Sequence, residues 1–184
     1  DSKGHHSTQY WDVSFAGQDD KSDDDFISEL RETIASSTAR RMIADVPLGA
    51  FLSGGVDSSG IVATMARHNA AHDCAPVTTC SIGFDNERFN ETTFARQVAE
   101  QYHTDHHELT VHENVHDTLR HIVRYFDEPF ADPSLVPTYF VSRLARQKVT
   151  VAIAGDGGDE VFAGYEKYSI DALENRLRGR IPSW

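Results

Sequence analysis

Short apolar stretches and stretches with helical spacing alternate along the chain. Four short stretches are predicted as strands: 48–52, 77–84, 105–111 and 149–155. Others carry apolar residues at the spacing of a buried helix face: 26–44, 58–70, 91–102, 114–125 and 135–147. The pattern therefore predicts one helix, followed by strands that alternate with helices.

This order of elements predicts the fold class. Strands separated by helices of about ten or more residues are joined by right-handed crossovers and form a parallel sheet. The helices then cover both faces of that sheet, which gives an α/β fold. In such sheets, ligands bind at the carboxyl ends of the strands, so we look for functional residues in the loops that follow each strand.

The N-terminal segment differs from the rest of the chain. Residues 1–25 are polar and end in the charged run QDDKSDDD, which we interpret as a solvated linker. We expect Asp24 or Asp25 to cap the helix that follows. Pro47 cannot continue this helix, so the helix ends before the first predicted strand.

The composition describes an acidic globular chain. Of the 184 residues, 39% are hydrophobic, and the formal net charge is −12. This charge repels phosphate backbones, so we expect small ligands and no nucleic acid. Because no run of about 18 apolar residues and no signal-peptide layout occurs, we expect no membrane insertion and a cytoplasmic location. Cys74 and Cys80 match neither a disulfide framework nor a zinc motif and are expected to be reduced thiols.

Two glycine-rich loops follow predicted strands. SGGVDSS (53–59) follows the first strand and GDGGDE (155–160) follows the fourth, and each leads into a predicted helix. Backbone N–H groups at such a helix N-terminus favour an anion, and serine hydroxyls add further donors. The first loop is not a Walker A loop, because the GxxxxGK[ST] spacing is absent. It indicates either a phosphate cradle or an ordinary turn with a helix N-cap.

The two loops also carry aspartates. Asp57 within an anion site requires a cation that mediates, and Mg²⁺ prefers oxygen ligands together with phosphates. Asp159, in the second loop, is the candidate for the partner carboxylate. The GxSxG elbow is absent, so Ser58 and Ser59 are not expected to be hydrolase nucleophiles.

These stretches resemble a known family. VPLGAFLSGGVDSSGIVATMA resembles the PP-loop of the N-type ATP pyrophosphatases. The blocks SIGF and GDGGDEVFAGY are similar to the synthetase domain of glutamine-dependent asparagine synthetases, and the similarity runs from about Tyr10 to Tyr168. The resemblance implies an α/β fold of the adenine nucleotide alpha hydrolase kind, and ATP and Mg²⁺ as cofactors.

The resemblance also implies roles for individual positions. Residues that match nucleotide-binding positions are the adenine contacts Leu52 and Ile82, the pyrophosphate loop with Ser53, Gly54, Gly55, Asp57, Ser58 and Ser59, and the nucleotide contacts Ala154 and Gly155. Asp57 and Asp159 match the Mg²⁺-associated aspartates. Asp156 stands where asparagine synthetases commonly have a glutamate that is needed to form the acyl-adenylate, and its side chain is one methylene shorter.

The implied reaction is the formation of an amide. Aspartate attacks the α-phosphorus of ATP, pyrophosphate leaves, and ammonia from glutamine displaces AMP. The resemblance implies that residues 1–25 are a linker from a glutaminase domain of the same longer chain, that 26–184 are the first half of the synthetase domain, and that the protein can be a homodimer. Two alternatives stay open: an enzyme that acts on another carboxylate, such as a β-lactam synthetase-like enzyme, and a nucleotide-binding module without catalysis.

Two further stretches look functional. HTDHHE (103–108) resembles a metal cluster, but His106 and His107 face opposite sides of a strand, so we expect structural or surface roles. DEPFADPS (127–134) is a rigid acidic loop. It either lines the acceptor pocket, as its place in the family implies, or is a plain turn.

Overall fold

The structure is a computed structural model that describes residues 4–13, 20–85, 90–112 and 114–179. The chain divides into two compact units, residues 1–33 and 34–184. The division falls inside helix α1 (Asp23–Arg41). The sheet and the candidate site belong to the second unit.

The second unit is built on a parallel sheet. Its strands are β1 (Leu48–Phe51), β2 (Thr78–Phe84), β3 (Asp105–Val111) and β4 (Val151–Ile153). They lie in the order β3-β2-β1-β4, and all three pairings are parallel. The predicted α/β class and all four predicted strands are confirmed.

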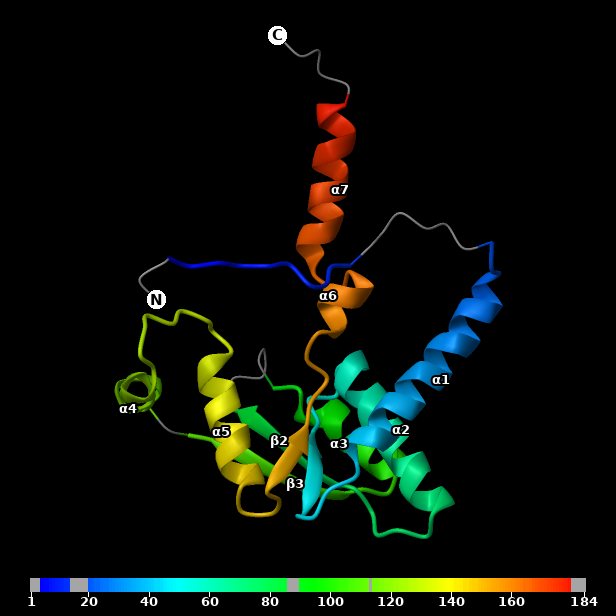
Figure 1. Cartoon of the computed structure of the whole chain (residues 1–184). Coiled ribbons are helices and arrows are strands. Elements are labelled where there is room, and N and C mark those ends of the chain that lie inside the picture. Colours follow the sequence, from blue (N-terminus) through cyan, green and yellow to red (C-terminus); the bar gives the residue numbers. More distant parts are fainter. Residues whose placement is uncertain (1–3, 14–19, 86–89, 113, 180–184) are drawn as a thin grey trace. The chain divides into compact units, whose positions relative to one another are not determined.

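Helices cover both faces of this sheet, as predicted (Figure 1). The helices of the second unit that follow β1 are α2 (Val56–Ala71), α3 (Thr92–Gln101), α4 (Val115–Ile122), α5 (Leu135–Ala145), α6 (Gly158–Phe162) and α7 (Glu166–Arg178), with a 3-10 turn, η2 (Val123–Tyr125). Helices α2 and α3 pack on one face, and α5 packs on the other.

Alternation along the strands gives each face its own core. On the α2 and α3 side, Ala50 and Leu52 pack with Val62 and Met65 of α2. On the α5 side, the buried residues include Cys80, Val111, Phe140 and Leu144. Parallel strands covered on both faces need apolar residues in both directions, which explains the short apolar runs of β1 and β4.

The order of the strands places the two glycine-rich loops side by side. After β1 the chain crosses to β2 on one side, whereas β4 pairs with β1 on the other, with Ala50 opposite Ile153. The carboxyl ends of β1 and β4 are therefore neighbours at the point where the strand order reverses. Crevices at such a point are the usual ligand sites of open α/β sheets.

The expected cap of the first helix is wrong by a few residues. Helix α1 begins at Asp23, and Ser22 is its cap, because the Ser22 hydroxyl accepts a hydrogen bond from the Asp25 backbone N–H at 3.2 Å. The Asp25 carboxylate in turn accepts from the Ser22 N–H at 3.2 Å. This reciprocal pair is a capping box, in which an acidic residue three positions on supports the capping serine.

Other boundaries moved, and one helix was not predicted. Helix α2 begins at Val56 and not at 58, so Asp57, Ser58 and Ser59 lie in its first turn. Strand β4 has three residues, so Ala154 and Gly155 follow the strand. Helix α7 has no counterpart in the sequence prediction. In the described part of the chain, no helix is long and apolar enough to span a membrane.

Phe140 is the largest fully buried side chain, so we expect it to be the most costly apolar residue to truncate. Phe140→Ala should lower the free energy of unfolding by about 3–5 kcal/mol, because it removes buried area and leaves a cavity. Urea unfolding followed by circular dichroism measures this change. Phe162→Ala, which truncates a side chain that is 54% exposed, is the matched control and should cost less than about 1 kcal/mol. Equal losses in the two variants would contradict the assigned core.

Candidate functional site

The loop after β1 contains a glycine, Gly54, that packs closely against α3. Gly54 has a φ of 87°, a conformation that glycine adopts without strain. A Cβ at this position would lie 2.5 Å from the Phe94 Cβ and 2.6 Å from the Ala95 backbone nitrogen. Only glycine lets the loop pass this close to the first turn of α3.

Serine hydroxyls tie the two ends of this loop together. The hydroxyls of Ser53 and Ser58 are 2.9 Å apart and share a hydrogen bond. The Gly55 N–H donates to the Ser53 hydroxyl at 3.2 Å, and the Ser58 hydroxyl donates to the Gly55 carbonyl at 3.2 Å. The chain therefore turns tightly around Gly55, which is the N-cap of α2.

The first turn of α2 offers donors. The first helical hydrogen bond of the turn runs from the Ser59 N–H to the Gly55 carbonyl at 3.0 Å. The N–H groups of Val56, Asp57 and Ser58 precede it and have no carbonyl within the helix to accept them. The Ser59 hydroxyl is buried and has no hydrogen-bond partner in the part of the chain that the structure describes. Such a turn fits an anion.

The second loop lies directly against Asp57. A Cβ on Gly155 would lie 2.8 Å from the Ser58 backbone nitrogen and 2.9 Å from the Asp57 carbonyl carbon. A Cβ on Gly158 would overlap the Asp57 carboxylate. The two glycine-rich loops, which are far apart in the sequence, therefore meet at Asp57, as their places after neighbouring strands predicted.

The second loop has two aspartates of its own, Asp156 and Asp159, and neither lies against Asp57. The Asp159 carboxylate lies against the backbone of Gly164, where a Cβ would overlap it. Asp156 is exposed in the turn before α6. Asp159 therefore follows Gly158, the glycine that touches Asp57. Asp156 is accessible to solvent at the edge of the same loop.

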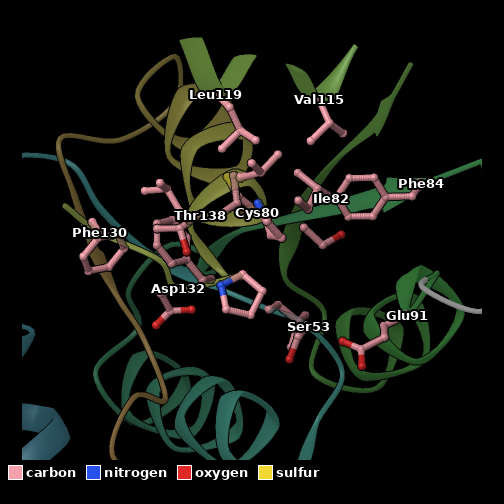
Figure 2. A pocket seen from close by; sticks show the side chains of 18 of the residues that line it. Ser53, Cys80, Ile82, Phe84, Glu91, Val115, Leu119, Phe130, Asp132 and Thr138 are labelled. Atoms are coloured by element: carbon pink, nitrogen blue, oxygen red, sulfur yellow. The ribbon is translucent and has the colours of Figure 1, made fainter. Parts of the chain in front are cut away.

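A cavity of about 970 Å³ opens beside the first loop. Leu52, Ser53 and Ile82, which the sequence analysis assigned to the nucleotide, all contribute to its wall. Figure 2 shows Ser53 and Ile82 around the same space as Phe130 and Asp132. The assigned residues of the second loop, Ala154, Gly155, Asp156 and Asp159, do not line this cavity.

The acidic loop before α5 forms one wall of the cavity. Phe130, Asp132 and Pro133 line it, together with Glu91 from the other side. The side chain of Ser134, together with its backbone N–H at 2.8 Å, hydrogen-bonds the Asp132 carboxylate and lowers the pKa of Asp132. The loop is thus a turn and a cavity wall at the same time, so the two interpretations of DEPFADPS do not exclude each other.

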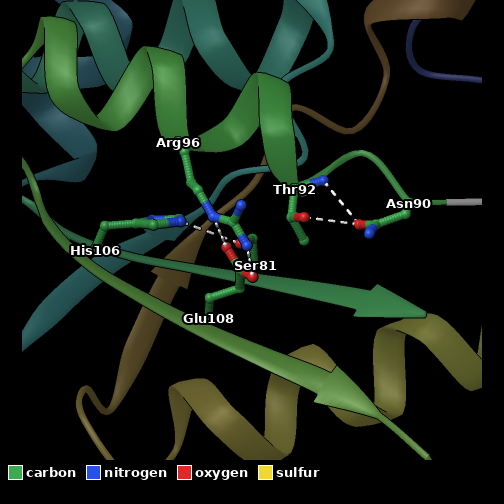
Figure 3. A network of polar contacts seen from close by, with 6 residues as sticks. All are labelled: Ser81, Asn90, Thr92, Arg96, His106 and Glu108. Atoms are coloured by element: carbon green, nitrogen blue, oxygen red, sulfur yellow. Dashed lines mark hydrogen bonds and ion pairs between the residues drawn. The ribbon is translucent and has the colours of Figure 1, made fainter. Parts of the chain in front are cut away.

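The sequence analysis missed a polar network on the α3 side of the sheet (Figure 3). Thr79 and Ser81 are buried, and both bond to His106: the Thr79 hydroxyl is 2.9 Å from Nδ1, and the Ser81 hydroxyl is 3.2 Å from Nε2. Burial lowers the pKa of His106, so the ring is neutral at pH 7. Above it, Arg96 of α3 binds both carboxylate oxygens of Glu108. Alternating hydroxyl-bearing residues in β2 were the signal for this network.

The histidine-rich stretch makes contacts on both sides of β3. His106 and His107 point to opposite sides of β3, as predicted, and His107 instead lies 3.2 Å from Asp105 on its own strand. Among the described residues, no group of three or more His, Cys, Asp or Glu side chains could hold a metal ion.

Comparison with known proteins identifies the family. The family model described as asparagine synthase matches residues 29–183. The chain belongs to this family. The resemblance of the glycine-rich loops to asparagine synthetases is therefore confirmed over nearly the whole second unit.

Individual relatives support this assignment. The chain is 43% identical over 142 residues to a putative glutamine-hydrolyzing asparagine synthetase 2 of Methanocaldococcus jannaschii, covering 76% of this chain and 26% of the relative. It is 37% identical over 162 residues to glutamine-hydrolyzing asparagine synthetase 1 of Bacillus subtilis, covering 88% and 25%. The chain thus spans about a quarter of the length of these relatives. Among solved structures, an NMN synthetase from Francisella tularensis matches with a TM-score of 0.48 at 16% identity, over 79% of this chain and 59% of that one.

The buried His106 makes stability depend on pH. Because its pKa is lowered in the folded protein, the unfolded chain takes up a proton near pH 6.5 that the folded chain still excludes. The free energy of unfolding should therefore fall as the pH is lowered through about 6.5, and His106→Gln should flatten this fall. Urea unfolding at about pH 7.5 and about pH 5.5 measures it. His112→Gln, at a well-exposed position, is the control and should keep the wild-type slope; a slope unchanged in His106→Gln would refute the assignment.

Proposed function

We propose that the second unit binds ATP as part of an asparagine synthetase-type ligase. The phosphates lie on the first turn of α2 and the adenine enters the cavity beside Leu52 and Ile82. The observation that carries this proposal is the meeting of the two loops at Asp57, next to a helix N-terminus with open donors. Membership of the asparagine synthase family supports it.

Three features support phosphate binding at this point. The N–H groups at the start of α2 and the buried Ser59 hydroxyl are donors that lack a protein acceptor among the described residues. Gly54 and Gly155 have no Cβ, which lets the first loop pack against α3 and the second loop pack against the first turn of α2. The Ser53 and Ser58 hydroxyls, which bond to each other, can turn toward phosphate oxygens.

A divalent cation fits beside these donors. Asp57 would hold Mg²⁺, joined by Asp159 once its carboxylate turns away from Gly164, since carboxylates and phosphate oxygens are the preferred ligands of this ion. The ion would supply positive charge against the pyrophosphate. The chain's own contribution is to position Asp57 by packing it against Gly158 and Gly155, which leaves that carboxylate one defined location.

The chemistry that these residues support is acyl transfer through an adenylate. A carboxylate oxygen of aspartate attacks the α-phosphorus of ATP, and the bond to the β-phosphate oxygen breaks. Ammonia from glutamine then attacks the acyl carbon, loses a proton, and displaces AMP. The donors of α2 stabilise the leaving pyrophosphate, and no covalent protein nucleophile is needed.

The acceptor and the partners belong to the same proposal. Asp156, exposed at the rim of the second loop, would act in the formation of the acyl-adenylate, in place of the family's usual glutamate. Relatives named glutamine-hydrolyzing support a glutaminase domain in the same longer protein as the source of ammonia, and a homodimer is compatible with it. Because the Asp156 side chain is one methylene shorter, a different carboxylate as acceptor is the second candidate.

The ATP site is tested by binding. Combining Ser53→Ala with Asp57→Ala should raise the Kd for ATP in the presence of Mg²⁺ at least about tenfold, because hydrogen bonds to a charged group and a cation ligand are lost. Removing Mg²⁺ with EDTA should narrow the gap between wild type and variant. Isothermal titration calorimetry measures both effects.

The matched control carries the same substitutions on α7, Ser169→Ala with Asp171→Ala; both positions are exposed and neither lines the cavity, so this variant should keep the wild-type Kd within about twofold. ATP affinity that survives in the loop variant would refute the assigned site.

The acceptor is tested by exchange of labelled pyrophosphate into ATP, in the protein that contains this chain. We expect exchange that depends on aspartate, because adenylation is reversible only when the acceptor carboxylate is present. Asp156→Ala should lower the exchange rate about tenfold or more and leave the Kd for ATP within about twofold. Asp156→Glu, which restores the family's usual residue, is the control and should retain exchange. Exchange with another carboxylate only would favour the second candidate; ATP binding without any exchange would favour a non-catalytic module.

A further inference from the structure

The first turn of helix α3 packs against the first glycine-rich loop at Gly54. Gly54 lies so close to it that a Cβ would come within 2.5 Å of Phe94 and 2.6 Å of the Ala95 nitrogen. This contact is made to the backbone of α3 and not to a flexible side-chain end. A shift of α3 therefore either pushes Gly54 or leaves it unsupported, since packed interiors transmit small displacements.

Buried Ala95 and Ala99 pack α3 on the sheet, and one ion pair joins the helix to β3. Arg96, in the middle of α3, donates from Nε to Glu108 Oε2 at 2.8 Å and from a terminal nitrogen to Oε1 at 2.5 Å. The pair is bidentate, which fixes orientation as well as distance. Glu108 is the more buried partner, with a side chain 19% exposed against 55% for Arg96.

The strand that carries Glu108 is itself held in place beneath α3. His106, two residues earlier on the same face of β3, bridges the Thr79 and Ser81 hydroxyls of β2. At the other end of α3, Gly83 of β2 lies so close to Thr92 that a Cβ would come within 2.8 Å of its methyl group. Figure 3 shows Arg96, Glu108, His106 and Ser81 together between α3 and the two strands.

We propose that Arg96 and Glu108 are positioning residues for the nucleotide site. They anchor α3 to β3, and α3 holds Gly54 where the first turn of α2 can receive the phosphates. The inference rests on the proposed function, because it names the residues that set the geometry of the same loop. Neither side chain lines the cavity beside that loop, so their effect on ATP passes through α3.

A purely stabilising role and a long-range charge effect would each give a different pattern of affinities. If the pair only stabilised the fold, its loss would lower the free energy of unfolding and weaken all ligands alike. If it acted by long-range charge, removing the Glu108 carboxylate would tighten binding of the ATP anion, whereas removing the Arg96 cation would weaken it. Positioning predicts that both changes weaken the binding of ATP and spare a ligand without phosphates.

The experiment compares ATP with adenosine on the whole chain by calorimetry. Glu108→Gln and Arg96→Gln should each raise the Kd for ATP about fivefold and leave the Kd for adenosine within about twofold. The double variant should be no worse than either single variant, because both remove the same pair. Arg96→Lys, which keeps the charge but not the bidentate geometry, should fall in between.

The matched control is Glu174→Gln, which breaks the Arg178–Glu174 pair on α7 and should leave both Kd values unchanged. Urea unfolding shows that every variant is folded at the temperature of the titration. Tighter or unchanged ATP binding in Glu108→Gln, or equal weakening of ATP and adenosine, would overturn the inference. If the wild type bound no ATP, the proposed function would fail; if Ser53→Ala with Asp57→Ala abolished binding while the Arg96 and Glu108 variants kept it, only this inference would fail.

Discussion

The close approach of the second loop's backbone to Asp57 is the constraint on which the candidate site depends. Gly155 and Gly158 leave room for Asp57 because they have no Cβ, and the pairing of β4 with β1 brings them there. Any side chain at Gly158 would displace the carboxylate from its place at the start of α2. The candidate site therefore requires all three: the strand order, the glycines of the second loop and the first turn of α2.

The two faces of the sheet contribute differently to the candidate site. On the α5 side, side chains of β2 such as Cys80 and Ile82 form an apolar wall, which suits a flat, weakly polar group. On the α3 side, alternate positions of the same strand, Thr79 and Ser81, are buried hydroxyls that need partners, and His106 supplies them. Because successive strand residues point to opposite faces, one segment of β2 lines the cavity on the α5 side and hydrogen-bonds His106 of β3 on the α3 side.

The sequence predicted the parts of this arrangement that follow from local pattern. Apolar periodicity located the strands, and glycines after strands located both loops, because glycine is required where backbones approach closely. The contact of Gly54 with α3 could not be predicted from the sequence, because it depends on how α2 and α3 pack on the sheet. His106 was recognised only as a residue that faces away from His107. Its partners are Thr79 and Ser81, more than twenty residues away, and only the register of β2 with β3 brings them together. Helix α7 was missed although Ile170, Leu173 and Leu177 have helical spacing, because these side chains are exposed and form no core.

The charge of the chain bears on how a nucleotide would enter. A protein of net charge −12 repels a triphosphate at a distance, and Glu91 and Asp132 add negative charge to the cavity wall. The start of α2 offsets this only locally, through its N–H groups and the positive end of the helix dipole, and Asp57 lies in that same turn. None of the described residues that line the cavity is a lysine or arginine. Uncompensated like charges at such short range are costly, so under the proposed function ATP would enter together with its cation. Asp57 would then attract the ion that the phosphates carry, and a residue that repels the free nucleotide would favour its metal-bound form.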